Sequence, residues 1–326
     1  MATSGTVATT TLDTAVLIDH AVRRCGLASS SQTPETVEIA KQNLYLLLLN
    51  LANRGLNLWC VENELYGLST AQREYALNPG TLRLLNVIYS QNSRVTGTDT
   101  VAANSVTTDL AVATKVVRYG FKPTASFTDA VTFSYSTDGV TFTIAQSLAS
   151  QDWVGGSWYW FDLDPTLEYQ YFQVASATNF TLDEFYLCNT YTDSTMTQFN
   201  RDEWTQQSNK FNVGRPSTNY YFDKTVSPTI SLWPAPNNDY DVVNMWRHRF
   251  VQDVGSLTQQ VEVPQQWMEA IVWQLAARLA YELPGVDQGR RTEVVQASER
   301  FLADAELSET DGAPIYMFSN VDVYTA

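Results

Sequence analysis

Few residues in this chain have the types and spacing that catalysis or metal binding needs. There are only two histidines, His20 and His248, and the three cysteines, Cys25, Cys60 and Cys188, lie far apart with no second cysteine or histidine beside them. Zinc sites and nucleophile–base pairs need such residues in clusters. The sequence also has no phosphate-binding glycine loop, nucleophile elbow or HExxH motif. We therefore expect no catalytic residue, cofactor or metal, and we expect structural histidines and buried thiols.

Two acidic motifs carry the residue types of a Ca²⁺ site. Asp162 and Asp164, in FDLDP, would share one face of a strand, and Asp138 lies in the stretch YSTDGVTFT. A Ca²⁺ site needs about six or more oxygen ligands, which neither motif supplies. A strand end before Pro165 explains the first motif, and Gly139 offers the positive φ that a tight hairpin turn requires. We therefore predict a hairpin at Asp138-Gly139 and no metal ligand in either motif.

The aromatic run DWVGGSWYWFDL offers rings that can stack on a sugar or pack in a core. Strand alternation puts Trp158 and Trp160 on one face, as a sandwich core or an interface requires, and stacking on carbohydrate is the alternative. Paired carboxylates for glycoside hydrolysis cannot be recognised by spacing among 35 acidic residues, because only their spatial separation defines such a pair. His248 lies between Arg247 and Arg249, whose charges disfavour its protonated form.

The charge balance restricts the possible partners. The net charge of −15 arises from 35 acidic and 20 basic residues, and residues 97–198 alone carry 11 acids and 3 bases. Phosphate contacts need clustered Lys and Arg, so a nucleic-acid-binding surface is not expected. The longest apolar run, Leu44 to Leu49, is far shorter than a bilayer span, and the N-terminus has no signal-peptide pattern. We expect a soluble protein that is not exported and does not bind membranes.

Apolar periodicity predicts a helical hairpin at each end of the sequence. The first comprises residues 11–26 and 33–55, and the second residues 264–284 and 287–307, with Gly26 able to form a left-handed C-terminal cap. Short helices are marginal in water unless they pack on other elements. We therefore predict that the two hairpins pack together through Val37, Leu44, Leu48 and Leu51 on one side and Met268, Ile271, Leu275 and Leu279 on the other.

The residues between the hairpins have a composition typical of strands. Short alternating runs such as VTFSYS and SWYWFDL fill residues 97–198 and predict an all-β sandwich. Polar turns at both borders indicate that this sandwich is an insertion. We therefore predict an α+β fold, in which residues 1–96 and 199–307 form one discontinuous domain of helices and short strands. The inserted sandwich comprises 97–198, and 308–326 form an extended C-terminal arm.

The inserted segment resembles a known family of β-domains. VTFSYSTDGVTFTIA, GGSWYWFDL, YQYFQVAS and LDEFYL follow one another in the order of strands, Asp-Gly turn, tryptophan and closing strand found in discoidin-type, galactose-binding-like jelly rolls. The resemblance implies a jelly-roll fold for 97–198. No basic or aromatic loop cluster corresponds to a sugar site of that family.

The outer segments resemble a different family. The stretch from TAVLIDHAVRRCGL to LANRGLNLW, then SPTISLWPAPNNDYDVVNMWRHRF and VPQQWMEAIVWQLAARLAYEL, are similar to head-to-tail adaptors of short-tailed bacteriophages, the tail tubular protein A-like connectors. The resemblance implies a non-enzymatic virion protein at the head–tail junction, made in the host cytoplasm. It would form a ring, usually of twelve copies, between the portal protein and the tail nozzle protein, with a possible tail-fibre contact through 97–198.

The acidic charge agrees with such a role, because a channel that passes DNA without binding it should repel phosphate. Two other functions stay open from the sequence: a tail-associated adhesin that binds host glycan through the sandwich, and a cell-wall hydrolase. The arm 308–326 regains large apolar side chains that have no partner segment, and we expect it to dock on a neighbouring ring, in the first place the portal. The alternative is that it folds back over its own helical bundle. Its docking residues would be Ile315, Tyr316, Met317, Phe318, Val321, Val323 and Tyr324.

Overall fold

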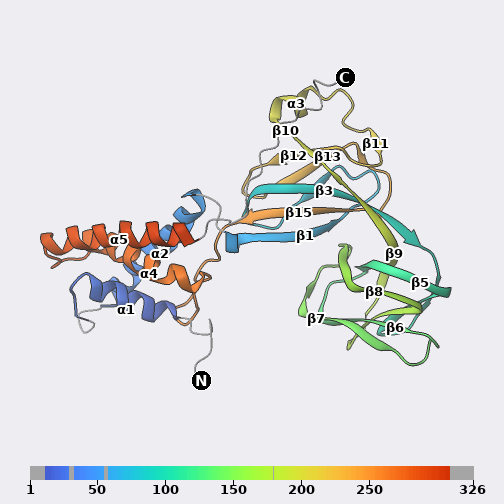
Figure 1. The fold of residues 1–326 in the computed structure, drawn as a ribbon, viewed down its shortest axis with the longest axis horizontal. Helices are drawn as coiled ribbons and strands as arrows, with labels where there is room; N and C mark the ends of the chain where they lie inside the picture. Colours follow the sequence, from blue (N-terminus) through green and yellow to red (C-terminus); the bar gives the residue numbers. More distant parts are fainter. Residues whose placement is uncertain (1–11, 29–32, 55–57, 179, 309–326) are drawn as a thin grey trace, which may run out of the picture. The chain divides into compact units, whose positions relative to one another are not determined.

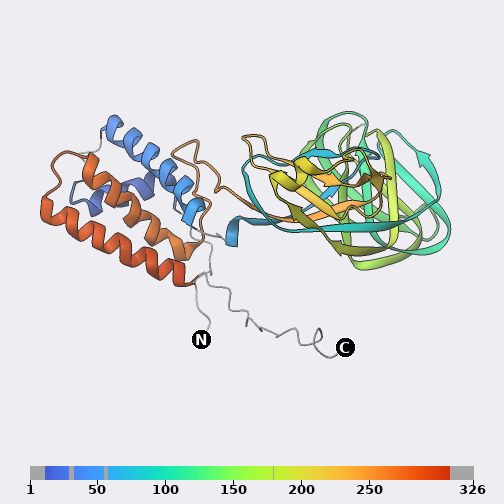
Figure 2. The ribbon, with the colours of Figure 1, turned by 90° about the horizontal axis from the view of Figure 1, so that it is seen from above.

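The structure is a computed structural model that describes residues 12–28, 33–54, 58–178 and 180–308. The chain divides into two compact units, one formed by Met1–Val61 with Phe250–Ala326 and the other by Glu62–Arg249. We call them the helical unit and the strand unit (Figures 1 and 2). The boundaries expected at 96/97 and 198/199 lie inside the strand unit, and independent folding of 97–198 stays a prediction.

The predicted α+β class is wrong, because the protein is mostly β. Among the described residues, strands hold 45% and helices 27%. The difference arises where short strands were expected beside the sandwich. There, β3 (Thr81–Val95) is one long strand. It pairs with β15 (Val242–Arg249) on one edge and with β9 (Leu182–Thr195) on the other. One large sheet therefore includes strands from both predicted domains.

The helical unit brings the two ends of the sequence together. Its elements are α1 (Thr14–Arg24), α2 (Pro34–Arg54), the 3₁₀ turn η2 (Leu58–Cys60), α4 (Gln265–Glu282) and α5 (Gln288–Ser308). Helices α4 and α5 lie side by side and antiparallel, and α1 and α2 both contact α4 (Figures 1 and 2). Among the described residues, no helix is long and apolar enough to cross a membrane.

One apolar cluster holds the helical unit together. It contains most of the residues predicted to join the two hairpins: Leu44, Leu48, Leu51, Ile271, Leu275 and Leu279, with Met268 packed against it. Val37 is half-buried and lies outside the cluster. Trp59 and Trp267 add a ring contact of 5.0 Å between centroids. The thiol of Cys25 is buried here, and it donates to the carbonyl of Ala276.

The strand unit contains a nine-stranded sheet in the order β1-β15-β3-β9-β5-β8-β6-β7, with β4 paired to β5. The strands not yet defined are β1 (Val61–Gly67), β4 (Thr98–Val101), β5 (Ser105–Pro123), β6 (Phe127–Ser136), β7 (Thr143–Trp153) and β8 (Tyr159–Ser176). A smaller sheet has the order β10-β12-β13-β2 and consists of β2 (Glu74–Ala76), β10 (Thr197–Phe199), β12 (Asn219–Asp223) and β13 (Thr229–Trp233). The pair β11 (Val213–Gly214) and β14 (Ala235–Pro236) and the short helix α3 (Arg201–Gln206) complete the unit.

Strands β4 to β9 pair antiparallel with one another, as the predicted jelly roll requires. They surround an aromatic core in which Tyr119 stacks on Phe133 at 3.9 Å between centroids. Trp153 is fully buried in the same core, and its indole N–H donates to the carbonyl of Asp129 at 2.9 Å. The stretch YSTDGVTFT therefore belongs to a densely packed domain.

Asp138 and Gly139 lie in the predicted hairpin between β6 and β7. Its loop is longer than a two-residue turn, because β6 ends at Ser136 and β7 begins at Thr143, with Tyr135 paired to Thr143. Gly139 has a φ of 71°, and Asp138 Oδ1 accepts from the backbone N–H groups of Val140 at 2.9 Å and Thr141 at 2.8 Å. Hydrogen bonds from these backbone groups hold the pKa of Asp138 at about 2. The carboxylate is therefore a turn former, because its charged form is the one that the backbone stabilises.

A buried polar network connects the strands of the large sheet. The carboxylate of Asp241, which has no exposed surface, accepts from the Tyr89 hydroxyl at 2.7 Å, from Asn92 N at 2.8 Å and from Arg215 Nε at 2.7 Å. The side-chain oxygen of Asn92 accepts from Arg118 Nη1 at 3.0 Å. Burial and the charge of Asp241 raise the pKa of Tyr89, so this hydroxyl stays protonated and donates.

We predict that Asp241→Ala lowers the free energy of unfolding by roughly 3 to 5 kcal/mol, because Arg215, Tyr89 and Asn92 lose a buried acceptor. Urea unfolding followed by near-UV circular dichroism measures the change. Asp183 is an exposed carboxylate of the same unit, and Asp183→Ala should change stability by no more than about 0.5 kcal/mol. Equal effects of the two substitutions would show that the network contributes nothing.

At the turn, Gly139→Val should lower stability by roughly 1 to 2 kcal/mol, because a left-handed backbone is costly for a branched side chain. An added Cβ would also lie 3.1 Å from the Tyr171 ring. Asp138→Asn should change little, since an amide oxygen accepts the same bonds. Thermal unfolding checks both, with exposed Val140→Ala as control. Stabilisation of the wild type by Ca²⁺ that Asp138→Asn abolishes would contradict the turn assignment.

Candidate binding site of the strand unit

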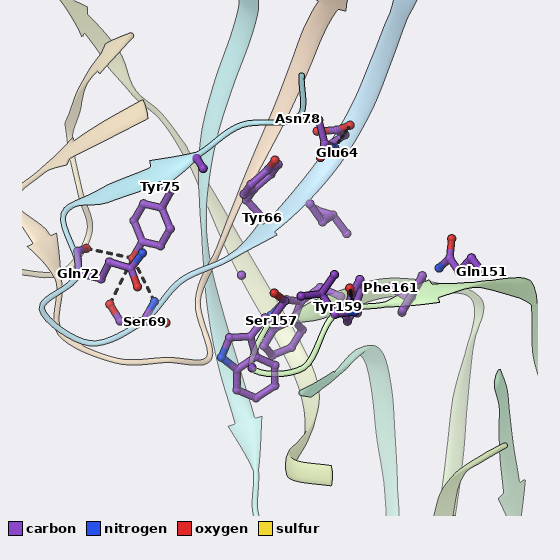
Figure 3. Close-up of a pocket in the computed structure, with 17 residues that line it drawn as sticks. Glu64, Tyr66, Ser69, Gln72, Tyr75, Asn78, Gln151, Ser157, Tyr159 and Phe161 are labelled. Atoms are coloured by element: carbon purple, nitrogen blue, oxygen red, sulfur yellow. Dashed lines mark hydrogen bonds between the residues drawn. The ribbon is translucent and has the colours of Figure 1, made fainter. Parts of the chain in front are cut away.

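A hollow of about 620 Å³ opens in the strand unit (Figure 3). One side comes from β1 and the segment that follows it through β2, and the other from the end of β7, the turn after it and the start of β8. The lining combines aromatic rings with amides, hydroxyls and one carboxylate. Its residues are Glu64, Leu65, Tyr66, Gly67, Ser69, Gln72, Tyr75, Ala76, Asn78, Gln151, Val154, Gly156, Ser157, Trp158, Tyr159, Trp160 and Phe161.

The carboxylate of Glu64 is fixed by neighbours on both sides. Its Oε1 atom accepts from Arg247 Nε at 2.7 Å and from Asn78 Nδ2 at 2.8 Å. Arg247 also pairs with Glu62 at 2.7 Å, and Glu62 accepts from Arg249 at 2.6 Å. Two carboxylates and two guanidinium groups therefore balance in charge, and they hold Glu64 in one orientation.

The opposite side depends on a close approach between β1 and the turn before β8. A Cβ added to Gly67 would lie 2.2 Å from the Cβ of Trp158 and 2.8 Å from the indole nitrogen of Trp160, so only glycine fits. The two tryptophan rings stack at 5.3 Å between centroids, and Trp158 also lies 4.8 Å from the ring of Tyr186. Trp160 is buried, whereas Trp158 is half-buried at the hollow.

Tyr75 shapes the loop at the other end of the hollow. Its hydroxyl accepts from Ser69 N at 3.0 Å and donates to the carbonyls of Gln72 at 3.0 Å or Ser69 at 3.2 Å (Figure 3). Burial raises the pKa of Tyr75 to about 12, and burial with the charge of Glu64 raises that of Tyr66 to about 12. Both phenols are therefore protonated at neutral pH and can donate hydrogen bonds.

Two buried polar atoms of the lining have no hydrogen-bond partner among the described residues. They are Glu64 Oε2 and Trp160 Nε1. An ionised carboxylate oxygen can only accept, and an indole N–H can only donate. Buried polar atoms in native proteins are paired with few exceptions, so each such exception has to be explained. A hydroxyl group can donate to a carboxylate oxygen and can accept from an indole N–H, so it suits either atom.

Few residues of the lining carry acid–base groups. Glu64 is the one carboxylate among the residues that line the hollow, whereas glycoside hydrolysis uses a pair of carboxyl groups. Burial raises the pKa of Cys25 to about 11 and that of Cys188 to about 12, which keeps these thiols un-ionised. Burial first, and then the charge of Arg83, lower the pKa of His248. Burial, and not the adjacent arginines, is therefore the main cause at His248.

The motifs singled out in the sequence lie in different places. Asp162 accepts from Arg118 Nε at 2.5 Å, and Asp164 lies beside it in a second hollow of about 380 Å³. No group of three or more His, Cys, Asp or Glu side chains in the described ranges could hold a metal ion. The expected docking residues lie outside the described residues: Ile315, Tyr316, Met317, Phe318, Val321, Val323 and Tyr324.

No motif in the sequence singled out Glu64, Gly67 or Tyr75, although one signal could have pointed to this region. Glu62-Asn-Glu64 and Arg247-His-Arg249 are complementary charge alternations of period two. Opposite charges on neighbouring strands form stabilising pairs, and this pattern predicts the observed neighbours β1 and β15. The approach of Gly67 to Trp158 has no comparable signal, because it joins elements far apart in the chain.

Comparison with known proteins gives partial likenesses only. Neither a scan against protein-family models nor a search of curated proteins finds a match. Among solved structures, a putative α-L-fucosidase from Bacteroides thetaiotaomicron is 10% identical over 30% of this chain and 22% of its own, with a TM-score of 0.25. The chain thus spans less than a quarter of that enzyme.

Small modules are also similar to part of the chain. The Clostridium perfringens module CpGH89CBM32-6 is 11% identical over 40% of this chain and 94% of its own, with a TM-score of 0.24. Chitosan-binding module 1 of a Paenibacillus sp. IK-5 chitosanase/glucanase is 14% identical over 40% of this chain and 96% of its own, with a TM-score of 0.22. TM-scores this low do not establish a shared fold, so function has to be inferred from the geometry of the chain itself.

Proposed function

We propose that the strand unit binds a glycan in the hollow between β1 and the start of β8. The observation that carries this proposal is the pair of unpartnered buried atoms, Glu64 Oε2 and Trp160 Nε1, among aromatic rings. A sugar offers hydroxyl groups that both donate and accept, together with apolar ring faces. Ligand sites of this kind combine an apolar lining with a few placed polar groups. The tail-associated adhesin that the sequence left as an alternative would bind glycan through the sandwich 97–198 alone. The hollow proposed here differs, because one of its sides comes from residues 64–78.

The size and surroundings of the hollow support the proposal. A volume of about 620 Å³ lies within the usual range for small-ligand pockets, roughly 300 to 1,000 Å³. The half-buried Trp158 offers an aromatic surface, and Gln72 and Gln151 are exposed amides at the rim. Two solved modules similar to this chain are described as bound to GalNAc-β-1,3-galactose or as chitosan-binding. Because both TM-scores are 0.22, these descriptions do not support the proposal.

We predict that the full chain binds one or more glycans on an array, and that calorimetry with the best of them locates the site. Trp158→Ala should weaken binding by about 10-fold or more through loss of an aromatic contact. Glu64→Gln should weaken it by about 10-fold, because the amide that replaces Oε2 cannot accept a hydrogen bond. Ile144→Ala, an exposed apolar side chain of the second hollow, is the matched control. Affinity that neither lining substitution changes, in variants with unaltered circular dichroism, would contradict the site.

A second candidate is the head-to-tail adaptor that the outer segments resemble. One observation favours an assembly: the helical unit leaves large apolar side chains exposed, with Tyr45 at 44%, Leu46 at 53% and Tyr281 at 66%. Exposed apolar patches mark interaction sites when they are contiguous. In this proposal the unit would contact copies of itself, the portal and the nozzle, with DNA passing through the ring.

For this candidate we predict a ring, usually of twelve copies, in mass photometry of the full chain alone or with portal protein. The exchange Leu46→Ser should dissociate it, because burying leucine in a contact contributes roughly 1.5 to 3 kcal/mol. Val226→Ser, at an apolar residue that is 99% exposed in the strand unit, serves as control. A chain that stays monomeric with and without portal would rule the adaptor out.

A further inference from the structure

The charge of the hollow restricts which glycans it can hold. Among the described residues that line it, Glu64 is the one charged side chain, and the other polar side chains carry amides, hydroxyls and indole N–H groups. Sites for acidic sugars need Lys or Arg, because a carboxylate or sulfate is recognised through charge-assisted hydrogen bonds. The lining therefore offers hydrogen bonds but no positive charge.

The guanidinium that contacts the lining, that of Arg247, is already used by the protein. Its Nε donates to Glu64 at 2.7 Å, its Nη1 to Thr81 Oγ1 at 3.1 Å and its Nη2 to Glu62 at 2.7 Å. Its side chain is 7% exposed. An acidic sugar could pair with Arg247 only by displacing Glu64 or Glu62, and the displaced carboxylate would then lie beside another negative charge.

Two other arginines lie near lining residues in the sequence or in space, but they contact aromatic rings outside the lining. The guanidinium of Arg73 lies 5.3 Å from the centroid of a ring in the loop after α3. That of Arg94 lies 3.7 Å from the ring centroid of Tyr186, whose hydroxyl donates to Glu184 and to Asp239. Neither arginine lines the hollow, and the two carboxylates at Tyr186 outnumber the one cation.

The charge of Glu64 acts on the groups around it. Its Oε1 is held by Arg247 and Asn78, whereas its buried Oε2 has no partner among the described residues. Glu64 and Asn78 lie together at one end of the hollow (Figure 3). Burial first, and then the charge of Glu64, raise the pKa of Tyr66 to about 12. A ligand carboxylate would be disfavoured here for the same reasons, because like charges repel strongly where water is excluded.

We infer that the hollow binds non-acidic glycans and that Glu64 is the residue that rejects acidic ones. This selectivity rests on the glycan binding proposed above. A neutral sugar offers hydroxyl groups, each of which can donate to Glu64 or accept from the indole N–H of Trp160. A uronic acid, a sialic acid or a sulfated sugar instead brings an anion into a lining without a cation. The net charge of −15 adds to this discrimination over a longer range.

The test measures a selectivity ratio on the full chain: the dissociation constant of an acidic glycan divided by that of its neutral counterpart. A glycan array that carries neutral oligosaccharides beside their uronate, sialylated and sulfated counterparts supplies the pair, and competition titration gives both constants. We expect a ratio of about 10 or more for the wild type. Trp158→Ala should weaken binding of the neutral member, which locates the measured binding in the hollow.

Two substitutions change the charge of the lining, and each has a matched control. Glu64→Gln removes the negative charge and should lower the ratio by about 5-fold or more, although it also weakens binding of the neutral glycan. Gln151→Lys adds a cation at the exposed rim, away from the network at Arg247, and should lower the ratio as well. Asp183→Asn and Ser147→Lys make the same changes of charge at exposed residues outside the lining. Solvent screens these distant charges, so the controls should change the ratio by less than about 2-fold.

Different outcomes overturn the selectivity and the glycan site itself. No binding on the array, or binding that Trp158→Ala does not weaken, would overturn the site and the inference with it. Binding in the hollow with a ratio near one, or with the acidic glycan preferred, would overturn the inference alone. A ratio that neither Glu64→Gln nor Gln151→Lys lowers, in variants with unaltered circular dichroism, would overturn the role of Glu64.

Discussion

The strand unit depends on one buried carboxylate and the amide beside it. Asp241 is surrounded by Tyr89, Asn92, Arg215 and Asn238, all of which donate to it. Because a buried charge without partners would be very costly, these groups must stay in place together. Asn92 extends the constraint to β5 through Arg118, whose side chain is 1% exposed. The strands that were expected to belong to two domains are therefore held in one arrangement.

The hollow follows from that arrangement. Its first side is carried by β1, which is neighbour to β15, and its second by β8, which is neighbour to β5. The network at Asp241 and Arg118 fixes β3, β15 and β5 relative to one another. The tight approach of Gly67 to Trp158 can be maintained only while these strands keep their register. Preorganisation of this kind lowers the entropic cost of ordering a site around its ligand.

Much of the local structure could be predicted, whereas the site could not. The helices followed from apolar periodicity and from cap residues such as Gly26, which has a φ of 83°, and the turn at Gly139 followed from its Asp-Gly pair. The fold class was wrong because the length of β3 and its two partners depend on long-range pairing, which local patterns do not contain. Trp158 and Trp160 were recognised as core or interface residues. Their contact with Gly67 joins distant segments, and a single sequence gives no measure of such distances.

The helical unit is made from both ends of the sequence, and this order has a consequence for synthesis on the ribosome. Helices α1 and α2 emerge first, but their main packing partner α4 begins at Gln265. The whole strand unit must leave the ribosome in between. The two ends of the strand unit lie close together, since Arg249 pairs with Glu62 at 2.6 Å. Folding of the strand unit therefore brings the chain that follows α2 close to the chain that leads to α4. Loop closure would then cost far less than for an unfolded intervening chain, and the middle of the chain would serve as the template for joining its ends.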